Sequence, residues 1–492
     1  MYNGLHMALR GFLKQISLYR LRYIAGYAFL FTVILIVLLL DIRYLPAGIS
    51  LDEMASAVAS SNLQPDLTFS WLINAPYYGL QKLSLFLFGI ERWTLVLPSL
   101  IFGTITMGLF FLTMRQWFRP SIAVVSTFVA LTASPFINVL RSATPDIMLL
   151  FWTITLLYAA VKLLIKREKA FIWKLIIVIS AAVLVYTPLG IYPLIAFVVV
   201  SLLHPHIRSR LRHIRLKRKI ILIFIGLAAL IPLVIYLINE PAGIKTLLGI
   251  DLFQTAFGDR RGTWKTFYMS YINVMRSGFA GTLVIPAFNV ASICLMLLGL
   301  FRCIKDHHTA RSYALLAWTA VVLPVILLAP TKQHLVIMPA LLLMTVGIET
   351  LILDWYKLFP RNPYARIAGL IPLTILFISI AVGNITHYFY NHLYIPNPAY
   401  RVSLNAIKQT IKDNPETQLL LVTDEPTTAF YSLLTKRHDN LRVTSTSPLE
   451  QPGGKTLVTP EATAATFSTQ PSRIITSHLS GDNGVALRIY TK

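Results

Sequence analysis

Residues 23–40 read YIAGYAFLFTVILIVLLL, an apolar stretch without a single charged side chain. A stretch of this length crosses the hydrocarbon core of a bilayer when it forms a helix. Only 13% of the 492 residues are charged, about half the ~25% that is usual in soluble domains. The composition therefore excludes a soluble globular enzyme, a disordered chain and a collagen-like fibre.

The same length criterion, applied along the whole chain, predicts a polytopic α-helical membrane protein with eleven spans. They lie at about 23–41, 93–113, 121–139, 146–165, 170–186, 188–204, 219–238, 284–303, 311–329, 335–353 and 365–388. The fifth and sixth spans share one apolar stretch, which Tyr186-Thr187-Pro188 interrupts. Because proline removes a backbone donor and the stretch is too long for one crossing, we predict two short spans there.

The distribution of Lys and Arg predicts the orientation. With the N-terminus in the cytoplasm, the inner loops hold 22 Lys and Arg and the outer loops before Tyr388 hold ten. This asymmetry follows the positive-inside rule, and the odd number of spans then places the tail outside. The net charge of +23 is explained by basic loops against anionic headgroups, so no nucleic-acid partner is expected.

Two domains are predicted, a transmembrane domain over residues 1–390 and an extracytoplasmic α/β domain over residues 391–492. In the first, residues 5–16 resemble an interfacial helix, and the first outer loop, residues 42–92, contains two amphipathic pieces at Leu51–Ser60 and Pro76–Phe88. In the second, strands are predicted at 418–424, 441–446, 454–460, 473–479 and 485–491, and a helix at 427–437. Their alternation is typical of a small α/β sheet.

Ionisable residues near membrane depth are candidates for function, because they are costly to keep there. On the predicted outer side these are Asp52, Glu53, Arg141, Asp146, Lys332 and His334. Three of them also have a structural explanation. Asp52 could cap a helix beginning at Glu53, Asp146 could complement a helix dipole, and Lys332 could snorkel to the interface.

Four motifs occur in order on the predicted outer face. They are Asp52-Glu53 followed by Asn74-Ala75-Pro76-Tyr77, then Arg141-Ser-Ala-Thr-Pro-Asp146, then Tyr186-Thr187-Pro188-Leu189-Gly190, then Lys332-Gln-His334-Leu-Val-Ile-Met-Pro339. Together they resemble the C-type (GT-C) membrane glycosyltransferases, in particular bacterial relatives of the protein O-mannosyltransferases and of the lipid A aminoarabinose transferases. The resemblance covers roughly residues 20–390. It departs at Asn74-Ala75-Pro76, where the family often has Lys or His before Pro-Pro.

The resemblance implies an inverting enzyme that moves a sugar from a polyprenyl-phosphate donor to a hydroxyl of a lipid, glycan or protein acceptor at the outer face of the plasma or inner membrane. One base suffices for this reaction, since the donor already carries a good leaving group. Asp52 is the expected base and Glu53 a second base or an orienting partner. Arg141, Lys332 and His334 are expected to hold the donor phosphate, and Asp146, Asn74 and Tyr77 to shape the acceptor site or pocket.

Several alternatives stay open on the sequence. Cofactors are either none or a divalent metal, whose ligands the sequence does not identify. Arg260 and Arg261 in the long outer loop are either phosphate ligands or solvated charges. The chain could instead be a lipid-linked glycan flippase, although the first outer loop has no counterpart in the second half, as repeated transporter halves would require. A non-enzymatic scaffold would leave the convergent outer charges unexplained.

Overall fold

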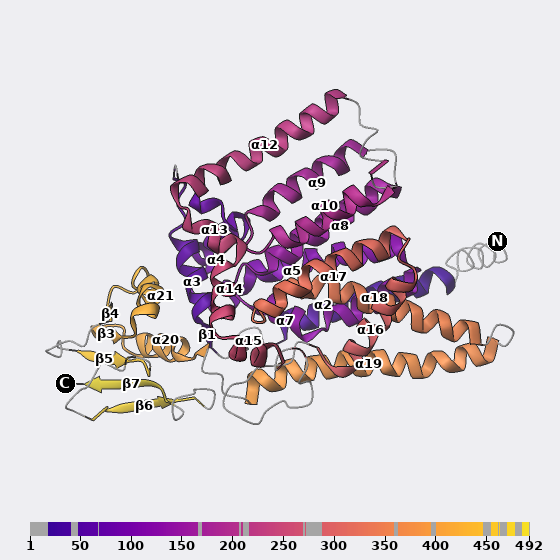
Figure 1. Ribbon diagram of the computed structural model, residues 1–492. Coiled ribbons are helices and arrows are strands. Elements are labelled where there is room, and N and C mark those ends of the chain that lie inside the picture. The colour runs from indigo at the N-terminus through magenta and orange to yellow at the C-terminus, as the bar shows by residue number, and fades with distance from the viewer. Residues whose placement is uncertain are drawn as a thin grey trace, which may run out of the picture.

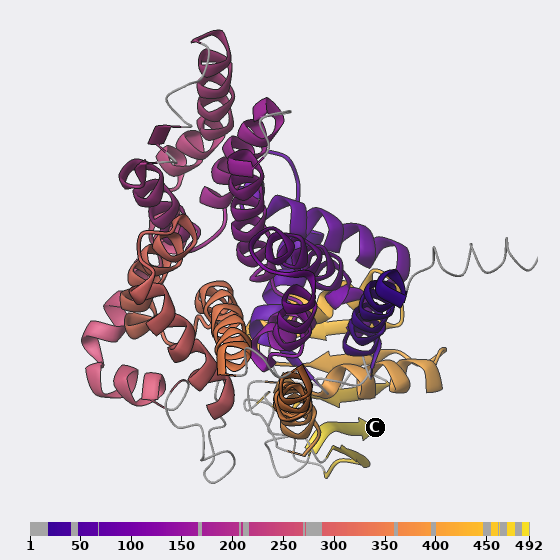
Figure 2. The same cartoon turned by 90° about the vertical axis from the view of Figure 1, so that its right-hand side faces the viewer.

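The computed structural model describes residues 18–40, 48–66, 68–165, 170–205, 208–209, 216–268, 271, 288–358, 363–394, 400–445, 454–460, 462, 470–477 and 485–491. The predicted interfacial helix at residues 5–16 lies outside these ranges. Long helices run side by side through the molecule, as Figure 1 shows from the side and Figure 2 end-on. A small sheet and its helices lie at one end of the bundle.

Every predicted span coincides with helical structure. The helices are α2 (Leu18–Leu39), α5 (Arg92–Trp117), α6 (Pro120–Leu131) with α7 (Ser134–Arg141), α8 (Ile147–Ile165), α9 (Ala170–Val185), α10 (Ile191–Leu203), α12 (Leu216–Asn239), α16 (Val290–Lys305), α17 (Ala310–Leu328), α18 (His334–Leu358) and α19 (Pro363–Tyr394). Within the described residues, six helices are long and apolar enough to cross a membrane. The fold class is thus confirmed, and eleven crossings stay a prediction.

The third predicted span is not one straight helix. It consists of α6 and α7, whose axes differ by 62°. Pro135 stands in the first turn of α7, where its ring disfavours helical backbone in the preceding residues. The bend leads α7 into the turn at residues 142–146, so it helps to place the motif that follows Arg141.

Helix α18 forms the centre of the bundle, with 78% of its most apolar window buried. It packs closely on α16 through two glycines. A methyl group on Gly299 would stand 1.9 Å from the carbonyl oxygen of Leu343, and one on Gly347 would stand 2.0 Å from that of Leu295. Small residues at such crossings let helix backbones approach closely, which drives packing inside a bilayer. By contrast, only 17% of the corresponding window of α12 is buried.

The first outer loop folds as predicted into two helices, α3 (Leu51–Ser61) and α4 (Ala75–Phe88), joined through a short 3-10 turn at Ser70–Leu72. The long second loop forms α13 (Ala242–Leu248), α14 (Ile250–Gly258) and α15 (Arg260–Phe267), and its residues 272–287 lie outside the described ranges. Figure 1 shows α3, α4 and α13 together at the end of the bundle that also carries the sheet.

The C-terminal region is the expected small α/β unit, and all five predicted strands and the predicted helix are confirmed. Its elements are α20 (Ser403–Asp413), β3 (Leu419–Val422), α21 (Glu425–Thr435), β4 (Leu441–Thr444), β5 (Lys455–Val458), β6 (Arg473–Thr476) and β7 (Val485–Thr491). The strand order is β4-β3-β5-β7-β6. Strand β3 pairs in parallel with both neighbours, whereas β7 pairs antiparallel with β5 and β6. Helix α20 was not predicted.

The C-terminal unit is tied to the first outer loop at three places. Strand β1 (Ile49–Ser50) pairs antiparallel with β2 (Tyr400–Arg401). The Arg437 guanidinium donates to the carbonyl oxygens of Leu85 at 3.3 Å and Phe86 at 2.8 Å. It thus supplies hydrogen bonds to carbonyl groups in the last turn of α4, where helical donors run out. Lys408 forms an ion pair with Glu91. These contacts join residues that are far apart in the sequence.

Candidate functional site

The helix that carries the acidic pair begins at Leu51, two residues before the start that a cap at Asp52 would require. Ser50 is its N-cap, with its hydroxyl accepting from the Glu53 backbone N–H at 3.2 Å, and the Glu53 carboxylate accepts from the Ser50 N–H at 2.9 Å. This reciprocal arrangement is a capping box. The alternative in which Asp52 caps a helix starting at Glu53 is therefore wrong.

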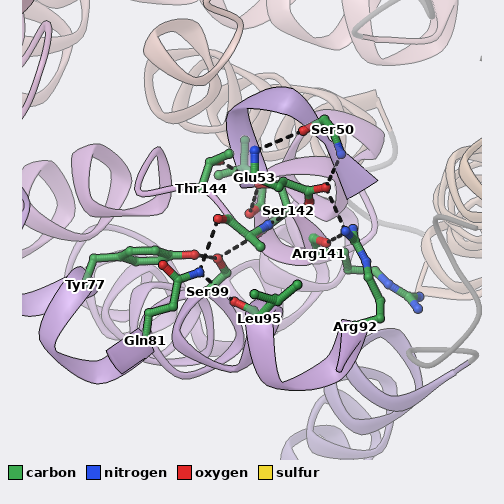
Figure 3. A network of polar contacts seen from close by, with 12 residues as sticks. Ser50, Glu53, Tyr77, Gln81, Arg92, Leu95, Ser99, Arg141, Ser142 and Thr144 are labelled. Atoms are coloured by element: carbon green, nitrogen blue, oxygen red, sulfur yellow. Dashed lines mark hydrogen bonds and ion pairs between the residues drawn. The ribbon is translucent and has the colours of Figure 1, made fainter. Parts of the chain in front are cut away.

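The Glu53 carboxylate is the centre of a buried polar cluster (Figure 3). It is 1% exposed and lies 2.7 Å from Nη1 of Arg92, which is 6% exposed. Its other oxygen accepts from the Ala143 N–H at 2.8 Å. Arg92 also donates to the carbonyl oxygen of Arg141 at 3.1 Å. Glu53 thus connects α3, the start of α5 and the turn after α7. Both of its carboxylate oxygens already have partners, whereas a second base would need an oxygen open to the acceptor.

A second layer of hydrogen bonds extends this cluster into α4. The Tyr77 hydroxyl lies 2.9 Å from that of Ser99, which donates to the Ser142 carbonyl oxygen at 2.5 Å. Gln81 accepts from the Ser56 hydroxyl at 3.0 Å and donates to the Leu95 carbonyl oxygen at 3.2 Å. These bonds fix the first outer loop against α5.

Tyr77 was expected to line a pocket, but its side chain is fully buried. Burial raises the pKa of its hydroxyl, and the negative charges of Glu53 and Asp146 add to this effect. The hydroxyl therefore stays protonated and acts as a neutral hydrogen-bonding group.

Asp146 and His334 are brought together by the fold. The Nδ1 of His334 lies 3.7 Å from Oδ2 of Asp146, and the Thr144 hydroxyl donates to that same oxygen at 3.2 Å. The Asp146 side chain is 38% exposed, whereas His334 is 8% exposed. Lys332 is half-buried and near enough for its charge to act on the His334 ring. The N-terminal ends of α8 and α18 thus bring three ionisable groups, Asp146, His334 and Lys332, to one place.

Asp52 has surroundings unlike those of its neighbour Glu53. Its side chain is exposed, and it makes no hydrogen bond or ion pair within the described part of the chain. It stands in the first turn of α3, where the helix dipole favours a negative charge. Asp52 is therefore a solvent-accessible carboxylate on a helix that the buried Glu53 holds in place.

Asn74 occupies an unusual position at the start of α4. Its φ of 52° lies in the left-handed region, which asparagine tolerates better than most residues. The side chain is 5% exposed, and its Oδ1 accepts no hydrogen bond from the residues that the structure describes. A buried acceptor left in this way is consistent with the expected role of Asn74 in a pocket.

The Arg141 side chain is placed differently from the expectation. It is 1% exposed, donates to the Leu40 carbonyl oxygen at 2.6 Å and lies over the rings of Tyr388 and Phe389 at 5.6 and 5.4 Å. It therefore belongs to a buried contact between α7, α19 and the residue after α2. Arg260 and Arg261 are exposed on α15, as the solvated alternative expects.

The described residues contain no group of three or more His, Cys, Asp or Glu side chains that could hold a metal ion. Asp146 and His334 together would supply two ligands, short of the complete coordination sphere of a catalytic metal. We therefore derive no step through a metal.

Sequence reasoning missed the partners of Glu53. The candidate residues from the sequence do not include Arg92, Ser99 or Gln81, and the sequence does not predict the strand pair β1–β2. One signal was present, since Ser50-x-x-Glu53 has the spacing of a capping box. The ion pair with Arg92 joins different helices and leaves no local pattern.

Residues 76–236 match the family model described as dolichyl-phosphate-mannose-protein mannosyltransferase. No curated protein matches the sequence. Among solved structures, ArnT from Cupriavidus metallidurans in the apo state is 15% identical, with a TM-score of 0.53 over 96% of this chain and 98% of ArnT.

Two further structures are similar to the chain. ArnT bound to undecaprenyl phosphate is 14% identical, with a TM-score of 0.52 over 95% of this chain and 97% of that one. The Archaeoglobus fulgidus oligosaccharyltransferase tethered with an acceptor peptide is 12% identical, with a TM-score of 0.53 over 87% of this chain and 64% of that one. The chain thus has the fold of the GT-C membrane glycosyltransferases, and the resemblance stated from the motifs is confirmed.

Proposed function

We propose that this protein transfers a sugar from a polyprenyl-phosphate donor to an acceptor hydroxyl, with inversion at the anomeric carbon. The observation that carries the proposal is the contrast at the acidic pair. Glu53 is buried and paired with Arg92, whereas Asp52 next to it is exposed and unpaired within the described residues. The fold shared with GT-C glycosyltransferases supports the reaction class.

In this proposal Asp52 is the general base. Its carboxylate takes the proton of the acceptor hydroxyl while the hydroxyl oxygen attacks the anomeric carbon of the donor. The bond from that carbon to the phosphate oxygen breaks, and the lipid phosphate leaves with the electron pair. A single displacement inverts the configuration. Glu53 does not share this role, because its oxygens accept from Ser50, Arg92 and Ala143.

Lys332 and His334 are the proposed ligands of the departing phosphate. Lys332 is half-buried and makes no side-chain hydrogen bond within the described residues, so its ammonium group has donors to offer. A charge-assisted contact there would stabilise the negative charge that develops on the phosphate. Asp146 lies beside His334 and is proposed to orient the ring. Arg141 acts in this account as a structural cation rather than a phosphate ligand.

The proposal places the site on the outer face of the cell or inner membrane. The support is the 22-to-ten distribution of Lys and Arg between alternate loops, together with the C-terminal unit packed on α4. In the same proposal the C-terminal unit is an extracytoplasmic domain beginning near residue 391. A reporter fused after Lys492 should be active only outside the cytoplasm, and activity inside would refute the orientation.

The direct test uses the purified full-length protein in lipid nanodiscs with a panel of polyprenyl-phosphate sugars and an envelope lipid extract as acceptor. The account expects acceptor-dependent release of the free polyprenyl phosphate, measured by mass spectrometry, and a product with inverted anomeric configuration by NMR. Movement of intact donor across sealed vesicles without release of lipid phosphate would instead support a flippase and contradict the proposal.

A further inference from the structure

A cavity lies between the end of α4 and the C-terminal unit, away from the acidic pair. Its volume is about 680 Å³. The residues that line it include Lys82, Phe86, Phe88, Glu91, Lys436 and Arg437. The first outer loop forms one side of the cavity, and α20, α21 and the residues directly after α21 form the other.

The charges around this cavity are mainly positive. Lys82, Lys408, Lys436 and Arg437 line it, and Glu91, which pairs with Lys408, is the acidic residue among the lining side chains. Arg437 and Lys82 donate to backbone carbonyl oxygens, which do not cancel a full charge. Lys436 is exposed and makes no ion pair within the described residues. The cavity thus keeps an excess of cations that suits an anionic ligand.

Beside these cations, α4 presents an exposed apolar surface. Leu83 is 51% exposed, Phe86 77%, Leu87 57% and Phe88 50%. Leu83, Phe86 and Leu87 share one face of the helix, since they are spaced three and four residues apart. Helix α4 packs against α5, one of the candidate membrane spans, so this face stands at the end of the membrane domain. An apolar face bordered by cations is typical of a helix lying in the membrane interface.

We propose that this cavity binds the phosphate headgroup of an anionic membrane lipid, with the acyl chains lying over the exposed face of α4. A free anion would use the cations but would leave four large apolar side chains in water. A phospholipid uses both features, because the same molecule carries a phosphate and acyl chains. The phosphate can contact the cations while the chains cover the apolar face of α4. The ligand class is therefore an acidic phospholipid of the leaflet that contacts α4.

This site is separate from the proposed reaction centre. Ser61, at the C-terminal end of α3, lines the cavity, and Asp52 lies in the first turn of the same helix. Nine residues of helix separate the two by about 14 Å. A lipid held here would anchor the first outer loop and the C-terminal unit to the membrane surface without occupying the space next to Asp52. The inference does not depend on the proposed glycosyl transfer.

The test measures lipid retention by the intact protein. Purified full-length protein is equilibrated with dioleoylphosphatidylglycerol or dioleoylphosphatidylcholine, and bound lipid is counted by native mass spectrometry. The variants are Lys436→Gln and Lys82→Gln, singly and together. Lys412→Gln is the matched control, because Lys412 is an exposed lysine of α20 outside the cavity.

The expected result is retention of phosphatidylglycerol over phosphatidylcholine by wild type and by the control. The preference of the double variant should be lower than that of wild type by about 30-fold, because each of the two cations near a membrane surface contributes about 1 kcal/mol. Phe86→Ser should weaken retention of the anionic lipid while its fold is checked by thermal unfolding. Equal retention of both lipids, an unchanged double variant, or displacement of the lipid by millimolar inorganic phosphate alone would each overturn the proposal.

Discussion

Asp52 and Glu53 are neighbours in the sequence, yet they belong to two different regions of the molecule. Glu53 points into a cluster that joins α3, α5 and the turn after α7, and every contact there is made by groups of low exposure. Asp52 is exposed and takes no part in the contacts of that cluster within the described residues. The buried carboxylate holds α3 in place through its partners, whereas the exposed carboxylate is accessible to solvent. Two adjacent acidic residues thus have different surroundings and, as we propose, different roles.

The largest effect on stability is expected from Glu53→Gln. The amide keeps a hydrogen-bond acceptor but removes the negative charge beside Arg92, which leaves a buried guanidinium without its counter-charge. Breaking a buried pair in this way costs about 3–5 kcal/mol. The unfolding midpoint in detergent should fall strongly. Asp52→Asn is the matched control and should leave the midpoint unchanged, whereas equal midpoints for both variants would remove the distinction between the two carboxylates.

Lys332→Met should weaken donor binding. The substitution keeps an unbranched side chain of similar length but removes the cation that we assign to the departing phosphate. Losing a hydrogen bond to a charged group costs about 1.5–3 kcal/mol, or roughly 10- to 150-fold in affinity. Titration with a polyprenyl phosphate measures the change. Lys245→Met, at an exposed position on α13, should bind as wild type does, and unchanged affinity of Lys332→Met would take Lys332 out of the site.

Arg437→Gln should loosen the contact between the C-terminal unit and α4. The change removes the guanidinium that donates to the Leu85 and Phe86 carbonyl oxygens. Because Arg437 is exposed, the expected loss is about 1 kcal/mol. Hydrogen–deuterium exchange should become faster in the last turn of α4 and not in α18. Lys412→Gln, at an exposed position on α20 outside the cavity, should show the exchange pattern of wild type.

A smaller, pH-dependent effect is expected at His392, which lies beyond the apolar window of α19 that ends at Phe389. Burial, together with the charges of Arg92 and Arg141, lowers the pKa of its imidazole to about 4. The unfolded chain therefore binds a proton that the folded chain excludes between about pH 6.5 and that value. Stability should fall as the pH falls through this interval. In His392→Phe the fall of the unfolding midpoint between about pH 7 and pH 5 should be smaller, and an equal fall would contradict the assignment.

The sequence predicted most of the helical architecture because long apolar stretches are a local signal. The strands of the C-terminal unit were predictable for the same reason, since short β-branched runs separated by turn residues carry their own pattern. The bend between α6 and α7 was missed because length alone does not show that Pro135 redirects a span.

The candidate site was predicted less completely, because its contacts are not local. Glu53 pairs with Arg92 on another helix, and β1 pairs with β2 from the far end of the chain. Two-residue strands carry no alternating pattern, so their pairing leaves no trace in the sequence. Asp146 and His334 were each predicted as candidates, but their proximity depends on how the N-terminal ends of α8 and α18 pack together.

The central claim is that Asp52, and not its buried neighbour, is the base of a sugar transfer. The measurement that tests it most directly is the turnover of Asp52→Asn in the nanodisc assay, with Asp66→Asn as an exposed control on the same outer loop. The account predicts that Asp52→Asn folds and binds donor as wild type does while its turnover falls by about 10²–10⁴-fold. The control should keep full activity. Wild-type turnover by Asp52→Asn would contradict the claim.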